Sequence, residues 1–286
     1  VKVPRKSAQD GKRDAQRGGV AGERSGARLT NEEIEKIVSS VAEISDNKEI
    51  KLIGEVTEDV LEAANQYTPG GTAKEGRGIL DEYYTESQVV DMVKSLLDFP
   101  AKSMKVIEPA VGTGNFLYAL PEIGEHTVVG LEINPTTAKI AKIFHQKSRI
   151  FNAPFESIFI DERGNKRDFK NDFDIVIGNP PYGEHRGKYL GLGEEKNLKS
   201  YEDYFLKRGI DMLKEGGTLA MVIPSSFLRG ATNTSLKFNI PKEAELINAF
   251  RLPNGIFKGT GIGTDIVIFK KNKAKNLTLR PLLIKE

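Results

Sequence analysis

An apolar run that ends in a polar, aromatic tip carries the clearest chemistry in this chain, at residues 174–182 (Asp-Ile-Val-Ile-Gly-Asn-Pro-Pro-Tyr). Residues 175–177 are β-branched and predict a buried strand, which the two prolines end because neither has an N–H for a neighbouring strand. Asn179 precedes a proline and is therefore restricted to extended backbone, which orients its amide. We expect the Asn179 amide, the Asn179 and Pro180 carbonyls and the Tyr182 phenol to meet at the carboxyl end of a strand, where open α/β sheets bind ligands. Tyr182 should stand on a stiff segment with its ring off the sheet, although Asn-Pro is also a common turn dipeptide.

A second stretch, residues 108–116 (Glu-Pro-Ala-Val-Gly-Thr-Gly-Asn-Phe), follows another apolar run. Gly112 and Gly114 allow the backbone to turn sharply into a helix and to approach a ligand closely, and the amino terminus of that helix would add N–H donors and positive potential. The stretch lacks the full dinucleotide motif G-x-G-x-x-G, and the chain has no phosphate-loop motif. Glu132 ends the next predicted strand, 20 residues after Gly112, and is placed to accept both hydroxyls of a nucleoside ribose. The loop, the acid and the tip should line one crevice.

From Ile79 onward the sequence alternates between predicted strands and helices, which is typical of a parallel sheet covered on both faces. The fold class is therefore α/β. Thr85 is expected to cap a helix that runs from about residue 86 to residue 97. Strands are predicted at 105–108, 127–131, 149–151, 173–177 and 218–223, helices at 135–145 and 202–213, and an antiparallel edge hairpin at 245–252 and 265–270.

The first 78 residues differ from the rest. Residues 1–28 hold eight Lys or Arg and three Asp or Glu with few large apolar side chains, so we expect a disordered basic tail. Residues 29–78 should form a helical segment and a flexible loop. Thr30 and Glu33 make a capping box for a helix whose apolar positions are Ile34, Ile37, Val38, Val41 and Ile44, and a second apolar segment from Ile50 leads to a helix with Val60, Leu61 and Ala64. Packing on the main domain and packing on a separate partner both remain open.

Composition sets limits on function. The chain has 286 residues, 38% hydrophobic and 29% charged, which suits a globular protein of one large domain or one domain with an appendage. It has no apolar run of membrane-spanning length and no secretory signal at its start. The absence of Cys rules out disulfides and thiolate metal sites and favours a reducing cytoplasm. The three histidines, His126, His145 and His185, lack metal-ligand spacing, so we expect surface or packing roles and no metal.

Charge is distributed unevenly. The tail takes eight of the 42 basic and three of the 40 acidic residues, which leaves 34 basic and 37 acidic residues in residues 29–286. This part therefore lacks the broad basic footprint of an autonomous nucleic-acid enzyme. The start without Met also suggests a processed chain or a piece of a longer one.

Over roughly residues 80–271, these motifs resemble class I S-adenosylmethionine-dependent methyltransferases, and within them the DNA adenine-N6 methyltransferases of the gamma arrangement. The most specific element is Asn179-Pro180-Pro181-Tyr182, which matches the family's catalytic tetrapeptide. Residues 108–116 resemble the cofactor loop, with Glu108 where Asp is usual. The resemblance implies a Rossmann-like fold with a mostly parallel seven-stranded sheet, helices on both faces and an antiparallel edge hairpin over residues 79–272, followed by a C-terminal extension, 273–286. It also implies S-adenosyl-L-methionine as cofactor and DNA as partner.

The resemblance further implies the residues of the site. Tyr83-Tyr84-Thr85-Glu86 is similar to an element that holds the methionine end, with Glu86 in place of Pro. Asn152 stands where the family usually has the Asp that meets the cofactor's adenine amine, and Phe151 and Phe155 could flank the adenine or pack in the core. The implied cofactor-binding residues are Tyr84, Thr85, Glu108, Pro109, Ala110, Gly112, Gly114, Asn115, Phe116, Glu132, Ile133, Asn152, Ala153 and Asn179; the implied catalytic residues are Asn179, Pro180, Pro181 and Tyr182.

The implied reaction is methyl transfer to the exocyclic N6 amine of a flipped-out adenine. A protein glutamine-amide or RNA-base methyltransferase shares the tetrapeptide, and a cofactor-binding subunit without catalysis is a third alternative. Residues 252–257 and 261–265 resemble methylase subunits of restriction-modification systems and of mobile elements, which suggests a cytoplasmic protein of bacterial or mobile-element origin. Gamma enzymes carry a target-recognition region after this point, and only residues 271–286 remain here. Specificity is therefore expected from a separate subunit or a missing domain.

Overall fold

The computed structural model describes residues 28–68, 85–97, 99, 103–121, 125–161, 163–169, 171–183, 198, 200–229, 243–257 and 262–272. Except for Arg28, the predicted tail 1–28 lies outside these residues, as do the predicted boundary at residue 79, Tyr84, His185 and the C-terminal extension 273–286.

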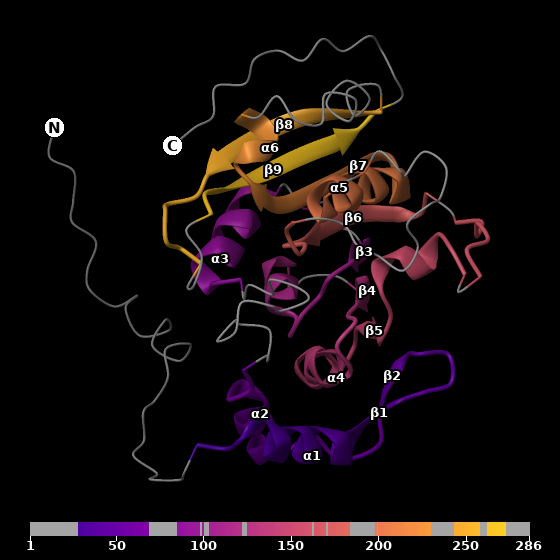
Figure 1. The fold of residues 1–286 in the computed structure, drawn as a ribbon, viewed down its shortest axis with the longest axis vertical. Helices are drawn as coiled ribbons and strands as arrows, with labels where there is room; N and C mark the ends of the chain where they lie inside the picture. Colours follow the sequence, from indigo (N-terminus) through magenta and orange to yellow (C-terminus); the bar gives the residue numbers. More distant parts are fainter. Residues whose placement is uncertain are drawn as a thin grey trace, which may run out of the picture.

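A seven-stranded sheet forms the centre of the molecule, with the strand order β5-β4-β3-β6-β7-β9-β8 (Figure 1). The first five strands in this order are parallel, and β9 is antiparallel to both of its neighbours. The mostly parallel sheet with an antiparallel hairpin at its edge is thus confirmed. The strands are β3 (Lys105–Glu108), β4 (Thr127–Leu131), β5 (Arg149–Phe151), β6 (Phe173–Gly178), β7 (Leu213–Pro224), β8 (Ala244–Arg251) and β9 (Thr264–Lys271).

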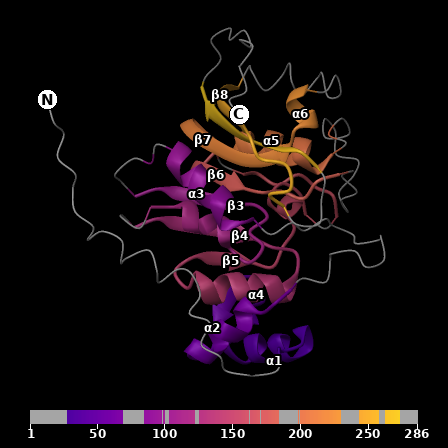
Figure 2. The ribbon, with the colours of Figure 1, turned by 90° about the vertical axis from the view of Figure 1, so that its left-hand side faces the viewer.

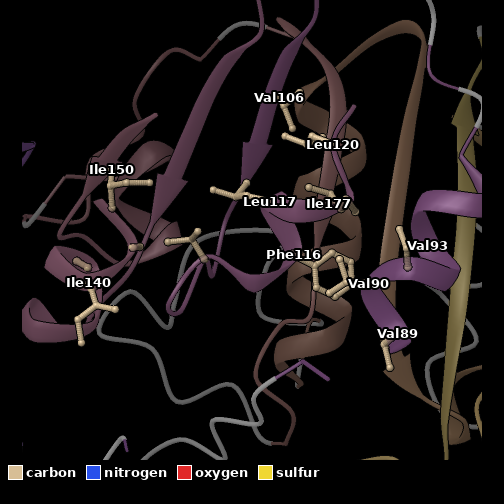
Figure 3. Close-up of a cluster of buried hydrophobic side chains, with 14 of the residues drawn as sticks. Val89, Val90, Val93, Val106, Phe116, Leu117, Leu120, Ile140, Ile150 and Ile177 are labelled. Atoms are coloured by element: carbon tan, nitrogen blue, oxygen red, sulfur yellow. The ribbon is translucent and has the colours of Figure 1, made fainter. Parts of the chain in front are cut away.

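Helices cover both faces of the sheet because side chains alternate between its faces along each strand. On β3, Val106 belongs to one core cluster and the adjacent Ile107 to the other. The first cluster contains residues of α3 (Ser87–Leu96) and α4 (Pro135–Phe144). The second contains residues of α5 (Tyr201–Met212) and α6 (Ser226–Arg229). Figure 3 shows part of the first cluster, where α3 faces Phe116.

The N-terminal segment packs on α4, which decides the question that the sequence left open. Ile34 and Val38 are fully buried in the same core cluster as Ile140 of α4, and Figure 2 shows the N-terminal helices stacked against α4 at one end of the sheet. The Lys139 ammonium also donates to the Ser39 hydroxyl at 2.9 Å. The elements of this segment are α1 (Asn31–Val41), β1 (Ala42–Ile44), β2 (Ile50–Leu52) and α2 (Glu58–Asn65).

The start of α1 agrees with its sequence signal, and its end does not. Thr30 and Glu33 form both bonds of the predicted capping box. The helix ends at Val41, however, and the prediction that Ile44 continues it is wrong. Ile44 lies in β1 opposite Ile50. Pairing with a strand that follows in sequence therefore overrides the helical spacing.

Two helix starts near the site also differ from expectation. Glu86 and not Thr85 is the N-cap of α3, and no side chain caps this helix. After Gly114 the chain turns into a helix as predicted, but this helix is a 3-10 helix of only five residues, η2 (Asn115–Ala119). A second 3-10 helix, η3 (Phe155–Ile158), follows β5. None of the helices in the described ranges is long and apolar enough to cross a membrane.

Candidate active site

The cofactor loop (residues 108–116) follows β3, Glu132 follows β4, and the Asn-Pro-Pro-Tyr tip follows β6. All three therefore lie at the carboxyl ends of adjacent strands of the sheet. Val106 and Ile107 of β3 pair with Ile175 and Val176 of β6, so that the ends of these two strands are level. A Cβ at Gly178 would lie 3.5 Å from Cγ of Glu108. Parallel pairing therefore brings together the three sequence features that were expected to meet.

Both glycines of the cofactor loop adopt left-handed backbone that disfavours other residues, with φ of +54° at Gly112 and +91° at Gly114. The two glycines differ in the space around them. A Cβ at Gly112 would have no atom within 4 Å, whereas a Cβ at Gly114 would lie 2.4 Å from Cδ2 of His145. The loop is thus open at Gly112 and supported from behind at Gly114.

Glu132 ties this loop to the start of α4. One carboxylate oxygen accepts from the Gly112 N–H at 3.0 Å, and the other accepts from the Asn134 N–H at 2.7 Å. The side chain is buried, and each carboxylate oxygen can accept more than one hydrogen bond. This geometry suits an acceptor of ribose hydroxyls, and that role remains a prediction.

Asn152 lies next to this acid with its amide orientation set by two backbone carbonyls. Its Nδ2 donates to the carbonyls of Glu132 and Ile133 at 3.0 and 2.9 Å, which leaves Oδ1 as the acceptor that the side chain offers to a ligand. Ile133 beside it is 53% exposed although it is a large apolar residue. An acceptor next to exposed apolar surface suits the amine and ring of an adenine, and that role of Asn152 remains a prediction.

The two phenylalanines considered for this part of the site have other contacts. Phe155 is buried in the core, where its ring makes edge contacts with Phe159 and Tyr204 at 5.2 and 5.8 Å between centroids. Phe151 has the Arg149 guanidinium 5.1 Å above its ring. The interpretation of Phe155 as core packing is therefore correct. Phe116 is similar, since its ring is buried with residues of α3 and only its backbone can face a ligand (Figure 3).

Glu108 ends β3 as a buried carboxyl group. Its side-chain Oε2 makes no hydrogen bond among the described residues, and the residue is 2% exposed. Burial first, and the negative charge of Glu132 second, raise the pKa of Glu108 well above its usual range. An unpaired carboxyl oxygen and open space at Gly112 are what a bound nucleoside with a cationic group would satisfy, so the residues present fit S-adenosylmethionine.

The Asn-Pro-Pro-Tyr tip is held by hydrogen bonds on both sides of Asn179. Its Oδ1 accepts from the Tyr182 hydroxyl at 2.6 Å, and its Nδ2 donates to the Thr85 hydroxyl at 3.4 Å. The Thr85 carbonyl in turn accepts from Nδ2 of Asn115 in the cofactor loop at 3.3 Å. Thr85 therefore connects the loop to the tip, a role that could not be read from its position in the sequence.

Tyr182 differs from expectation, because its ring is 7% exposed and does not stand off the sheet. Its hydroxyl bonds Asn179 and lies 3.4 Å from the Val222 carbonyl on β7. The Val222 carbonyl lies near this hydroxyl only because β6 and β7 pair, so no local pattern in the sequence indicated this position.

His145 is a further residue of the site that sequence reasoning did not assign to it. The ring lies against Gly114, with its centroid 4.7 Å from that of Tyr118. Burial lowers the pKa of His145 to about 4, so the imidazole is neutral near pH 7. Packing was the expected role, but 31 residues separate His145 from Gly114 and no spacing rule connects them. Within the described ranges, no three His, Asp or Glu side chains are grouped so that they could hold a metal ion.

Comparison with known proteins gives one family and several relatives. The family model described as N-6 DNA methylase matches residues 50–284. Defense against restriction protein B of Escherichia phage P1 is 28% identical over 212 aligned positions, with 72% of this chain and 9% of that protein covered. The methylase subunit of the type I restriction enzyme StySPI of Salmonella potsdam is 24% identical over 227 residues, with 71% of this chain and 43% of the subunit covered.

A relative of a different kind comes from Methanocaldococcus jannaschii and is provisionally named a protein N5-glutamine methyltransferase. It is 27% identical over 160 residues, which cover 56% of this chain and 74% of that protein. Among solved structures, the methyltransferase subunit of a type I restriction-modification system from Streptococcus thermophilus has a TM-score of 0.57 at 22% identity, covering 78% of this chain and 51% of that one. The match confirms the methyltransferase fold.

Proposed function

Because the chain belongs to the N-6 DNA methylase family, whose model matches residues 50–284, we propose that it methylates the exocyclic N6 amine of adenine in DNA. The observation that carries this proposal is the intact Asn-Pro-Pro-Tyr tip at the end of β6, joined through Thr85 to the glycine loop. The family uses S-adenosylmethionine, which supplies an electrophilic methyl group when it is bound.

The cofactor is proposed to lie across the ends of β3 and β4. Glu132 would accept the ribose hydroxyls, and Asn152 Oδ1 would accept from the adenine amine next to Ile133. The buried Glu108 and the Thr85 region would serve the methionine end. The opening at Gly112 supports this placement, because any side chain there would occupy the space in front of the loop.

Asn179 and Pro180 would activate the acceptor amine. The lone pair of the adenine N6 is delocalised into the ring, which makes this nitrogen a poor nucleophile. If Asn179 Oδ1 and the Pro180 carbonyl accept its two N–H bonds, the nitrogen moves towards tetrahedral geometry and its lone pair becomes available. Positioning and oriented dipoles then supply the rate enhancement. The methylated nitrogen, now cationic, releases one proton to water, with S-adenosylhomocysteine as the other product, so no general base is required.

Tyr182 would change partners when the substrate enters. The target base must leave the duplex to reach this site. The amine N–H of the base would then donate to Asn179 Oδ1, either beside the Tyr182 hydroxyl or in its place, because an amide oxygen accepts two hydrogen bonds. The released ring would stack on the base, a contact of ~1–3 kcal/mol. In the described state the ring instead holds Asn179 in place.

Methylation of a protein glutamine is a second candidate, supported by the archaeal relative. A carboxamide nitrogen has the same delocalised lone pair as the adenine amine, so the tip alone does not separate the two acceptors. The family match favours DNA over both this acceptor and an RNA base.

Sequence specificity is proposed to come from a partner subunit or a further domain. The matched part makes up only 9% of the phage relative and 43% of the Salmonella subunit. Residues 29–286, with 34 basic and 37 acidic residues, also offer little nonspecific attraction to phosphates. Location in the cytoplasm of a bacterial host is part of the same proposal.

The experiment is methyl transfer from labelled S-adenosylmethionine to unmethylated duplex DNA, with digestion to nucleosides and mass analysis. Parallel reactions contain RNA and a glutamine-containing protein. We expect N6-methyladenine from the wild type, much less from Tyr182→Ala, and an intermediate amount from Tyr182→Phe, which keeps the ring but loses the bond to Asn179. Product in the protein or RNA reaction alone would replace the proposed acceptor, and failure to bind the cofactor would overturn the proposal.

A further inference from the structure

We propose that the turn at residues 45–49, which joins β1 to β2, is a positioning element for the adenine side of the cofactor site and acts through Asn152. This inference rests on the adenine role proposed for Asn152. The turn lies just before residue 50, where the family match begins, so it is a feature of this chain outside the matched region.

The turn is held in one conformation by its own hydrogen bonds. The Asn47 Oδ1 accepts from the Ser45 hydroxyl at 2.6 Å and from the Glu49 N–H at 3.1 Å. The Lys48 N–H donates to the Ser45 carbonyl at 2.8 Å. Lys48 has a φ of +68°, which is uncommon for a residue other than glycine and persists only when the surroundings determine it.

This conformation presents the Lys48 carbonyl to the site. The carbonyl accepts from the Asn152 N–H at 2.8 Å. Asn152 directly follows β5, the edge strand of the main sheet in the described ranges, so within those ranges no further strand of that sheet is available to accept from this N–H. The turn therefore supplies the backbone partner that the sheet does not.

Glu49 fastens the turn to the same strand. It forms an antiparallel bridge with Phe151, and its carboxylate bonds the Arg149 guanidinium at 3.1 and 3.3 Å. This two-bond geometry is stronger and more directional than a single ion pair, and the Glu49 side chain is only 10% exposed.

The connection continues inward from Asn152. Its Nδ2 bonds the carbonyls of Glu132 and Ile133, and Glu132 bonds the Gly112 N–H. Displacement of the turn would therefore move the Asn152 amide relative to the Glu132 carboxylate and to the loop at Gly112. The effect should be largest for recognition of the adenine amine, because that contact depends on the position of one oxygen atom.

The test measures the affinity for S-adenosylhomocysteine and for its hypoxanthine counterpart, in which an oxygen replaces the 6-amino group. We expect the wild type to prefer the adenine compound by about tenfold, the size of one well-placed hydrogen bond. Glu49→Ala and Asn47→Ala should reduce this preference to about twofold or less. Lys139→Ala is the matched control, since it removes the Lys139–Ser39 bond of the same N-terminal interface without touching the turn, and its preference should equal that of the wild type.

Asn152→Ala separates the two proposals. If Asn152→Ala keeps the full preference, the adenine role proposed for Asn152 is wrong and the inference fails with it. If Asn152→Ala loses the preference while Glu49→Ala and Asn47→Ala keep it, only the role of the turn is overturned. An equal loss of affinity for both compounds in the turn variants, with the preference intact, would also overturn it, because that result indicates general loosening of the site.

Discussion

At the scale of single residues, the site separates groups that would meet the acceptor from groups that would hold the cofactor. Asn179 lies at the tip of β6 and bonds Tyr182 and Thr85, whereas Glu132 bonds the loop and the start of α4. Each group can thus be removed with a different expected result.

Asn179→Ala and Glu132→Ala should therefore have reciprocal effects. Loss of Asn179 should lower methyl transfer by about 10²–10³-fold, the size seen when one oriented polar group is removed from an active site, and should weaken cofactor affinity much less than the loss of Glu132 does. Loss of Glu132 should weaken cofactor binding by roughly tenfold or more, because hydrogen bonds to a charged group are lost. Equilibrium titration with S-adenosylmethionine and single-turnover transfer would measure both. Loss of binding in Asn179→Ala, or unaltered affinity in Glu132→Ala, would show that these roles are wrongly assigned.

The buried Glu108 predicts a pH dependence of stability. Its pKa is raised in the folded chain above the usual 4.5, so the folded state holds its proton more tightly than the unfolded state does. This contribution to stability is complete below about pH 4.5 and is lost as the pH rises through the raised pKa. Without cofactor, the melting temperature of the wild type should therefore fall more steeply than that of Glu108→Gln as the pH rises above about 4.5. Parallel curves for the two proteins would contradict the raised pKa.

At the scale of elements, the end of α4 supports the cofactor loop. His145 is the C-cap of α4, and its ring occupies the place where a side chain at Gly114 would lie. The loop is followed by only a short 3-10 helix, so its conformation depends on this contact more than on a long helix behind it.

Gly114→Ala should reduce cofactor affinity by about tenfold or more, since the new Cβ would lie 2.4 Å from Cδ2 of the His145 ring and positive φ also costs of order 1–3 kcal/mol. Gly216→Ala is the control. Gly216 also has positive φ, +76°, but a Cβ there meets nothing within 4 Å, so this variant should lose stability and keep cofactor affinity. Adding His145→Ala to Gly114→Ala should recover part of the affinity. Equal affinities in the two glycine variants would exclude the His145 contact as the cause.

At the scale of the whole molecule, the N-terminal segment and the main sheet share one core. Ile34 of α1 and Ile140 of α4 belong to the same buried cluster, and the antiparallel bridge between Glu49 and Phe151 joins the segment to the sheet edge. The segment should therefore unfold with the sheet and not before it.

Ile34→Ala should lower the free energy of unfolding by about 2–5 kcal/mol, the cost of removing a fully buried aliphatic side chain. Ile53→Ala, at a position that is 53% exposed in the same segment, should change it by about 0.5 kcal/mol or less. Denaturant unfolding followed by circular dichroism would measure both variants. A separate early transition in Ile34→Ala would show that the segment unfolds independently.

The sequence by itself determined the elements whose signals are local. The alternation of apolar, strand-like runs with helical segments predicted β3, β4 and β5 with their observed bounds, and the capping box of Thr30 and Glu33 predicted the start of α1. The order of strands and loops also placed Gly112, Glu132 and Asn179 at the same edge of a parallel sheet. These features follow from backbone propensity, side-chain periodicity and the rule that parallel strands end together.

Tertiary structure alone decided the contacts between residues far apart in the chain. The burial of Tyr182 depends on the Val222 carbonyl of β7, the support of Gly114 on His145, and the position of Asn152 on the Lys48 carbonyl. Ile44 left its helical pattern because a strand partner was available at Ile50. Such contacts exist only after the sheet has brought the segments together, so no local pattern in the sequence carries them.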